Sequence, residues 1–207
     1  VKSASEMKKG FGPLVCAVLS SDESFIPFFA NASGNAVKAV NQPTHVTITS
    51  NAEIGNWPPL GFALELSWRY PDVVQTLLEC RANPNHVDAL GFHVMGGCKT
   101  TEFVDLLVKY HGDVNHATSP AYFPVLSLAC ARCAPPDVIR KLIEERANVN
   151  PESRGVCSPH PLSNLAVWSA MNAGCVEAAD ILLEAKSDIN STSKAKGLFH
   201  AIELASR

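Results

Sequence analysis

Four stretches of this chain repeat one pattern, an amphipathic segment closed by a polar tail that ends in asparagine. The tails end at Asn85, Asn115, Asn150 and Asn190, at steps of 30, 35 and 40 residues. Self-similarity at this period is typical of repeat arrays, in which one supersecondary unit stacks on the next. This feature constrains the fold most, because a unit this small cannot bury its apolar face without a neighbour.

Each repeat contains two apolar segments of different length. The longer segment precedes the asparagine tail and carries apolar residues at i, i+3 and i+4, as at Ile139, Leu142 and Ile143. That spacing predicts a helix with one apolar face. Shorter apolar segments lie before the longer ones, over 60–68, 90–98, 124–133 and 164–174. The unit is therefore predicted to be a short helix, a tight turn, a longer helix and a polar finger.

These units resemble ankyrin repeats. The stretch "GCVEAADILLEAKSDIN" (174–190) follows the second half of the ankyrin signature, G-x-x-E-I-V-x-L-L-L-x-x-G-A-D-V-N. "LGFHVM" (90–95) is similar to the first half, T-P-L-H-x-A, with His93 in the histidine position, where the resemblance implies a structural role at the turn. His200 takes the same position in "KGLFHAIELASR" (196–207). The resemblance implies an all-α, ankyrin-type helical repeat solenoid.

The predicted organisation is an N-terminal segment, 1–12, followed by a single domain over 13–207. That domain contains about five repeats plus a half, near 13–35, 58–85, 88–115, 122–150, 162–190 and 196–207. An insertion, 36–57, separates the first two repeats. Within it, "HVTITS" (45–50) alternates apolar and polar residues, which predicts an extended β-hairpin finger near 42–57.

The glycine that follows the longer helix in ankyrin repeats is replaced in all four copies by a basic or imidazole residue: Arg81, His111, Arg146 and Lys186. Glycine there permits the left-handed conformation that ends a helix. A side chain in that conformation costs about 1–2 kcal/mol. The column could attract an acidic partner, but the neighbouring Glu79, Glu144, Glu145 and Glu184 favour a solvated edge.

The composition excludes several classes of protein. A formal charge of -3 gives no basic footprint for nucleic acid, and no apolar run approaches the roughly 20 residues of a membrane span. No phosphate-binding glycine loop, Ser/His/Asp pattern or carboxylate pair is present, so we expect neither an enzyme nor a cofactor. The chain begins at Val1, which is consistent with a removed leader or a longer chain. Seven cysteines without a scaffold spacing favour reduced thiols in a reducing intracellular compartment, cytoplasmic or inside an organelle.

One cysteine–histidine set could bind zinc: Cys130, Cys133, Cys157 and His160. Thiolates and imidazole at such spacing suit tetrahedral zinc. The repeat register argues against this site, because it places the two pairs at opposite ends of a short helix, about 13 Å apart. Buried cysteine as a small apolar residue is the favoured interpretation.

The predicted function is protein–protein interaction without catalysis. The resemblance implies binding through the concave face of short helices and the finger tips, and the 42–57 finger is the first candidate. The candidate binding residues are Trp57, Trp68, Arg69, His86, Asp88, Lys99, His116, Tyr122, Arg132 and Asn172. Trp57 and Trp68 serve equally well as binding anchors or as fillers of gaps between diverged repeats; for Trp168, in the histidine position, packing is favoured.

The partner is expected to be protein. Two forms of the function stay open: a structural subunit of a large multi-subunit complex, or a soluble adaptor with a transient partner. The diverged repeats and low charge favour the subunit. Fold alone does not decide between them.

Overall fold

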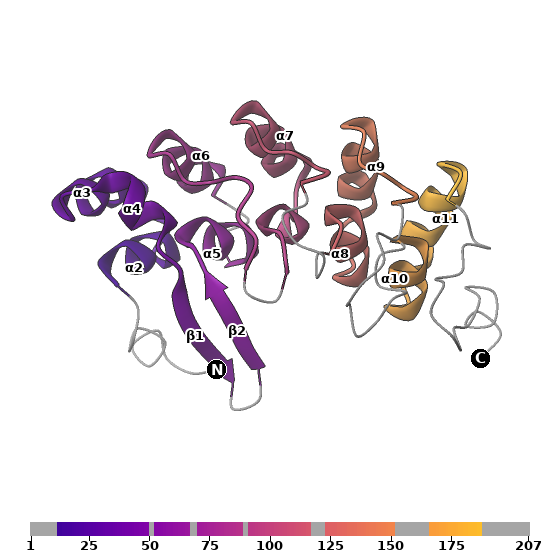
Figure 1. Ribbon diagram of the computed structural model, residues 1–207, viewed down its shortest axis with the longest axis horizontal. Coiled ribbons are helices and arrows are strands. Elements are labelled where there is room, and N and C mark those ends of the chain that lie inside the picture. The colour runs from indigo at the N-terminus through magenta and orange to yellow at the C-terminus, as the bar shows by residue number, and fades with distance from the viewer. Residues whose placement is uncertain are drawn as a thin grey trace.

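The computed structural model describes residues 12–49, 52–66, 70–88, 91–116, 123–151 and 166–187. Its helices form an arch of two rows, with longer helices along the outside and shorter ones along the inside (Figure 1). The outer row is α3 (Phe25–Ala32), α6 (Pro71–Glu79), α7 (Thr101–Lys109), α9 (Pro136–Glu144) and α11 (Val176–Glu184). The inner row is α2 (Pro13–Leu19), α5 (Pro59–Leu66), η1 (Val94–Gly97), α8 (Val125–Ala131) and α10 (Ala166–Asn172).

The outer helices begin where the sequence favours a helix start. Pro71 and Pro136 occupy the first turns of α6 and α9, where proline lacks only an N–H that would be unpaired anyway. Thr100 caps α7, because its Oγ1 accepts a hydrogen bond from the Phe103 N–H at 3.4 Å. Helices α6, α7 and α9 thus have a local reason to start after their turns.

A continuous apolar core runs between the two rows. In α9 the buried face is formed by Val138, Ile139 and Leu142, each worth about 1.5–3 kcal/mol when fully buried. The predicted stripe was right for its central residues but extended too far at one edge: Ile143 is only half-buried, and Leu183 of α11 is 46% exposed.

The residues that replace glycine after each outer helix adopt the left-handed conformation. The φ angles of Arg81, His111, Arg146 and Lys186 lie between 63° and 69°. All four side chains are exposed, which agrees with the interpretation of a solvated edge. Their backbone carbonyls, rather than their side chains, connect the units.

A ladder of asparagines joins consecutive units through these carbonyls. Asn115 Nδ2 donates to the Arg146 carbonyl at 2.8 Å, and Asn115 Oδ1 accepts from the Asn148 N–H at 2.7 Å. Asn85 bonds the His111 carbonyl and the Asp113 N–H in the same way, at 3.0 and 2.7 Å. We call Asn41, Asn85, Asn115 and Asn150 the asparagine ladder, because each donates to the left-handed residue of the next unit.

The first unit is longer than the sequence indicated. Helix α4 (Ala36–Asn41) lies in the segment assigned to the insertion. Gly34, at φ +74°, breaks the outer row after α3, and Asn35 then caps α4 by accepting from the Lys38 N–H at 2.9 Å. Asn41 ends the first unit, because its side chain bonds the Arg81 carbonyl and the Asn83 N–H. The inserted finger therefore begins after this helix.

The finger itself is an antiparallel hairpin of β1 (Thr44–Thr49) and β2 (Ala52–Trp57). It projects from the side of the inner helices (Figure 1). Its strands pair from Thr44 with Trp57 to Thr49 with Ala52, with irregular register between. The predicted hairpin near 42–57 corresponds to these two strands, and its base delivers Trp57 to the start of α5.

The third unit has a 3-10 turn, η1, where a full short helix was expected. Two glycines, Gly96 and Gly97, weaken helix formation there. They also allow close packing: a Cβ on Gly96 would lie 2.4 Å from the Leu128 side chain of α8. The segment therefore forms a 3-10 turn instead of a full helix, and its backbone lies close to α8 of the next unit.

Among the described helices, none combines the length and apolar character needed to span a bilayer.

Candidate functional site

Arg132, which ends α8, is the centre of a cluster on the inner side of the arch. Its guanidinium forms an ion pair with Glu65 of α5 and lies 5.3 Å from the Trp57 ring centroid and 5.7 Å from that of Phe92. Lys99 Nζ is 3.8 Å from the other carboxylate oxygen of Glu65. One carboxylate thus serves two cations, and a guanidinium stacked on aromatic rings gains about 0.5–2 kcal/mol.

Asp88 fixes the tryptophan of this cluster. The Asp88 carboxylate is buried and accepts hydrogen bonds from Trp57 Nε1 at 3.1 Å and from the Phe92 N–H at 2.9 Å. The Trp57 ring packs edge-on against Phe62, and a Cβ on Gly61 would lie only 3.2 Å from it. The base of the hairpin is therefore rigidly held, and Trp57 is half-buried there. We call Trp57, Glu65, Asp88, Phe92, Lys99 and Arg132 the Arg132 cluster.

His93 has a structural role beside the cluster. Its imidazole is 1% exposed, and its Nδ1 accepts a hydrogen bond from the Met95 N–H at 3.1 Å. Burial first, and then the neighbouring His116 and His86, lower the pKa of His93 to about 3. The imidazole is therefore neutral at physiological pH and bonds the backbone at the turn, as the sequence predicted. His200 lies outside the described residues.

A groove of about 360 Å³ lies next to Arg132, between α8 and α10. Phe92 and Phe123 form one wall, with ring centroids 5.1 Å apart. We call it the α8–α10 groove; it is lined by Phe92, Phe123, Ser127, Leu128, Ala131, Arg132, Trp168, Ser169, Asn172 and Ala173. Aromatic rings with one flanking cation give a surface suited to an apolar side chain of a protein partner.

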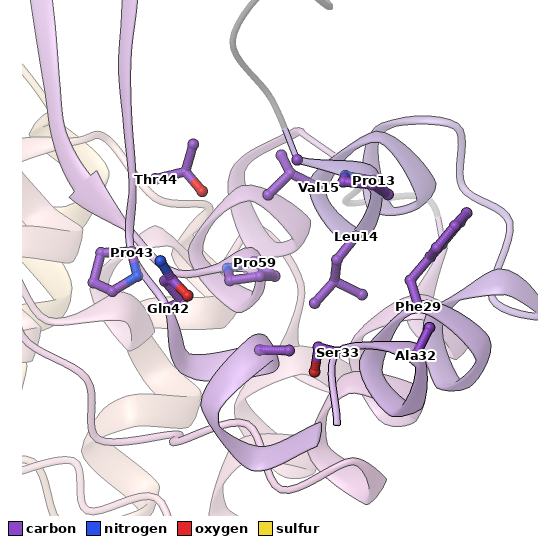
Figure 2. A pocket seen from close by; sticks show the side chains of 12 residues that line it. Pro13, Leu14, Val15, Phe29, Ala32, Ser33, Gln42, Pro43, Thr44 and Pro59 are labelled. Carbon is purple, nitrogen blue, oxygen red and sulfur yellow. The ribbon is translucent and has the colours of Figure 1, made fainter. Parts of the chain in front are cut away.

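A second hollow, of about 630 Å³, lies at the N-terminal end of the arch (Figure 2). Its walls come from α2, α3 and the connection that follows α4, and include Leu14, Phe29 and Pro43. Nearby, Phe25 and Phe28 of α3 are 49% and 63% exposed. These two exposed aromatic side chains give the first unit an apolar surface beside the hollow.

The structure describes seven of the ten residues predicted to bind a partner. Four belong to the Arg132 cluster, two lie beside His93 and one lines the α8–α10 groove: Trp57, Asp88, Lys99 and Arg132; His86 and His116; and Asn172. Trp68, Arg69 and Tyr122 lie outside the described residues. The binding role of all ten stays a prediction.

Sequence reasoning missed Glu65, Phe92 and Phe123 and favoured a packing role for Trp168. Glu65 left one signal, as the single charge in the short apolar segment 60–68. Phe92 belongs to a Leu-Gly-Phe motif that is repeated thirty residues apart, which marked it as structural. Nothing in the sequence relates Phe123 to the groove.

Two cysteines of the zinc hypothesis are placed in ways that do not favour metal binding. Burial raises the pKa of the Cys130 thiol to about 12, so the thiolate that zinc requires is disfavoured. Cys133 forms a disulfide with Cys175. Cys157 and His160 lie outside the described residues. Within the described ranges, no group of three His, Cys, Asp or Glu is arranged to hold a metal ion. The expectation of fully reduced thiols is wrong for Cys133 and Cys175.

Comparison with solved structures identifies the architecture. The chain superposes on the human ASB11 ankyrin repeat domain with a TM-score of 0.67, covering 94% of this chain and 77% of that one, at 15% sequence identity. The fold is an ankyrin-type repeat solenoid. The predicted fold class is therefore confirmed. Neither the family models nor the curated proteins compared with the chain gave a match, so the likeness concerns the fold alone.

Proposed function

We propose that this chain is a non-catalytic interaction module that binds a protein partner through the Arg132 cluster, the α8–α10 groove and the hairpin finger. Residues 13–207 form one repeat domain in this proposal. The partner is protein rather than nucleic acid in this proposal, because the formal charge of -3 shows no basic excess.

The observation that carries the proposal is the contact of Arg132 with Trp57 and Phe92 beside an apolar groove. Arginine and tryptophan are the residues most enriched in interface hot spots. Arg132 follows α8 at the position that Ala173 takes after α10, and Trp57 lies in the inserted hairpin, so the asparagine ladder requires neither of them. A side chain kept outside the repeat pattern and held by several contacts is a good candidate for a specific function.

Exposed apolar side chains on the first unit favour a structural subunit over a free adaptor. Phe25, Phe28 and Val37 are 49%, 63% and 43% exposed on adjoining helices of the first unit. Apolar surface of this kind is usually covered in a permanent complex. We therefore propose a lasting assembly, with the transient adaptor as the alternative.

The native mass of the endogenous protein in a gentle extract tests this choice. A particle far larger than the 22.2 kDa of this chain, with the same co-migrating proteins in each preparation, is expected. Migration as a monomer under all conditions would reject the subunit proposal and leave the transient adaptor.

A pair of arginine variants tests the surface. Arg132→Ala should reduce recovery of the partner about tenfold or more, the loss of a contact worth over 1.4 kcal/mol. Arg140→Ala is the matched control, because Arg140 pairs with Glu184 on the outer row. Equal recovery with both variants, each shown to be folded by circular dichroism, would place the binding surface elsewhere.

A further inference from the structure

The disulfide joins corresponding turns of two consecutive units. Cys133 lies in the turn between α8 and α9, and Cys175 immediately precedes α11 in the turn after α10. Their Cα atoms are 5.8 Å apart. Disulfides most often connect Cα atoms about 5.5–6 Å apart, so the backbone of this turn pair accommodates the bond where it stands.

Cys133 occupies a backbone position that favours glycine. Its φ is +47°, and the Ala134 N–H bonds the Ala129 carbonyl behind it. In the next unit Gly174 takes the same position at φ +74°, with the Cys175 N–H bonded to the Ala170 carbonyl. A non-glycine residue is disfavoured in this conformation. The conformation does not by itself require a cross-link, since Ser21 adopts it at φ 56° in the turn between α2 and α3. In this unit it places the Cys133 backbone within cross-linking distance of Cys175.

The cross-linked pair is also accessible to solvent. Cys133 is exposed and Cys175 is half-buried, whereas Cys98 and Cys130 are buried in the core. Thiol–disulfide exchange requires a thiolate to reach a sulfur atom. Of these four cysteines, the disulfide is thus the pair that a reductant reaches without unfolding the chain.

The bond lies at the end of the α8–α10 groove. Arg132, which precedes Cys133, lines the groove from α8, and Ala173, two residues before Cys175, lines it from α10. Helices α8 and α10 pack directly on each other. Covalent connection of their ends therefore limits how far the two walls of the groove can separate.

We propose that the Cys133–Cys175 disulfide is a reducible clamp that holds the α10–α11 unit against its neighbour and keeps the α8–α10 groove in its binding shape. The reductant is a dithiol: its two S–H bonds and the Cys133–Cys175 S–S bond break, and two cysteine S–H bonds form. The dithiol leaves as a cyclic disulfide, so two electrons and two protons pass to the protein. The clamp stands on the turn geometry alone, and only its effect on binding rests on the proposed function.

Peptide mapping tests the bond itself. Protein purified without reductant and treated with oxidised glutathione is alkylated in denaturant and digested with trypsin and chymotrypsin. Both enzymes are needed, because the tryptic peptide 155–186 contains Cys157 together with Cys175. A linked peptide pair containing Cys133 and Cys175 is expected. Alkylation of both residues, or linkage of either to another cysteine, would overturn the proposal.

Hydrogen exchange tests the clamp. Addition of dithiothreitol should accelerate amide exchange in α10 and α11 about tenfold, while α6 is unchanged, because only the last described unit loses its restraint. The melting temperature should fall by on the order of 5–10 °C. The Cys133→Ser/Cys175→Ser variant should resemble reduced protein in both states, and the control Cys16→Ser/Cys80→Ser should respond as wild type does. Equal exchange in oxidised and reduced wild-type protein would refute the clamp.

Partner recovery from matched extracts tests the consequence for binding. Oxidised protein should recover at least about threefold more of the partner than the double serine variant does. Equal recovery would refute the regulatory part of the proposal while hydrogen exchange still reports on the clamp. Absence of any partner with either form would instead count against the proposed function.

Discussion

The asparagine ladder and the inner side of the arch are held together by different kinds of contact. Along the ladder, the same hydrogen bonds recur from unit to unit, as when Asn85 and Asn115 each bond a left-handed residue in the unit that follows. Other contacts occur once among the described residues: Trp57 with Asp88 and Arg132 with Glu65 on the inner side, and Cys133 with Cys175 in the turns between the rows. Repetition thus maintains the array, and the contacts outside the repetition give this chain its individual surface.

Removing a side chain from the apolar core between the two rows should have the largest effect on stability. Leu142→Ala is expected to lower the free energy of unfolding by about 3 kcal/mol, because the fully buried side chain leaves a cavity between the rows. Leu183→Ala is the matched control, since Leu183 is 46% exposed, and it should cost under about 1 kcal/mol. Urea unfolding measures both. Similar losses would contradict the described core.

Breaking the ladder should have the next largest effect. Asn115→Ala removes the hydrogen bonds to the Arg146 carbonyl and from the Asn148 N–H, at a cost of about 2 kcal/mol. Asn31→Ala, an exposed position on α3, should change stability by less than about 0.5 kcal/mol. Partner binding should survive the Asn115 change in protein that remains folded. Loss of binding without loss of stability would show that the asparagine ladder also takes part in partner binding, which would contradict the division between the two kinds of contact.

Acid should weaken the turn that contains His93. The unfolded imidazole takes up a proton near its ordinary pKa of 6.5, while the folded one resists protonation until about pH 3. The unfolded state therefore binds more protons as the pH falls, and stability is lost below about pH 6.5. Between pH 7 and pH 5 the loss should be about 2 kcal/mol.

His93→Asn is the control for this effect. Asparagine retains an acceptor for the Met95 N–H but does not titrate, so its stability should vary less with pH than that of the wild type. Urea unfolding at pH 7 and pH 5 gives the comparison. Identical pH dependence in the two proteins would show that another group is responsible.

Restoring glycine on the repeated side should have the smallest effect, and a stabilising one. Arg146→Gly relieves the left-handed conformation at φ +66° and should raise stability by up to about 1 kcal/mol, because part of the 1–2 kcal/mol relief is offset by glycine's greater unfolded entropy. Arg140→Gly, inside α9, should instead lower stability by about 1 kcal/mol. Thermal unfolding distinguishes the two signs.

The same division explains what the sequence could predict. The repeated units could be predicted, because Asn85, Asn115 and Asn150 recur at similar spacing in the sequence. The residues in the glycine position all adopt the left-handed conformation. The hairpin followed from a local alternation. Helix α4 was missed because Gly34 divides the outer row of the first unit, and its asparagine comes 44 residues before the next.

The contacts that occur only once give no periodic signal in the sequence. Arg132 and Glu65 are 67 residues apart, and Cys133 and Cys175 are 42 residues apart. Pairs at these separations meet only once the units have stacked, so no window of sequence contains both partners. Arg132, Trp57 and Asp88 were predicted from the sequence as binding residues, which stays a prediction, and their contacts with one another required the structure.

The asparagine ladder also bears on how such a chain can change in length. Asn41, Asn85 and Asn115 present the same two hydrogen-bonding atoms to whichever unit follows, and each following unit offers a carbonyl and an N–H two residues apart. A unit lost or duplicated by recombination would leave a joint of the same kind on both sides of the junction. Consecutive units are therefore joined by the same hydrogen bonds, so gene rearrangement can lengthen or shorten the arch without changing the contacts between units.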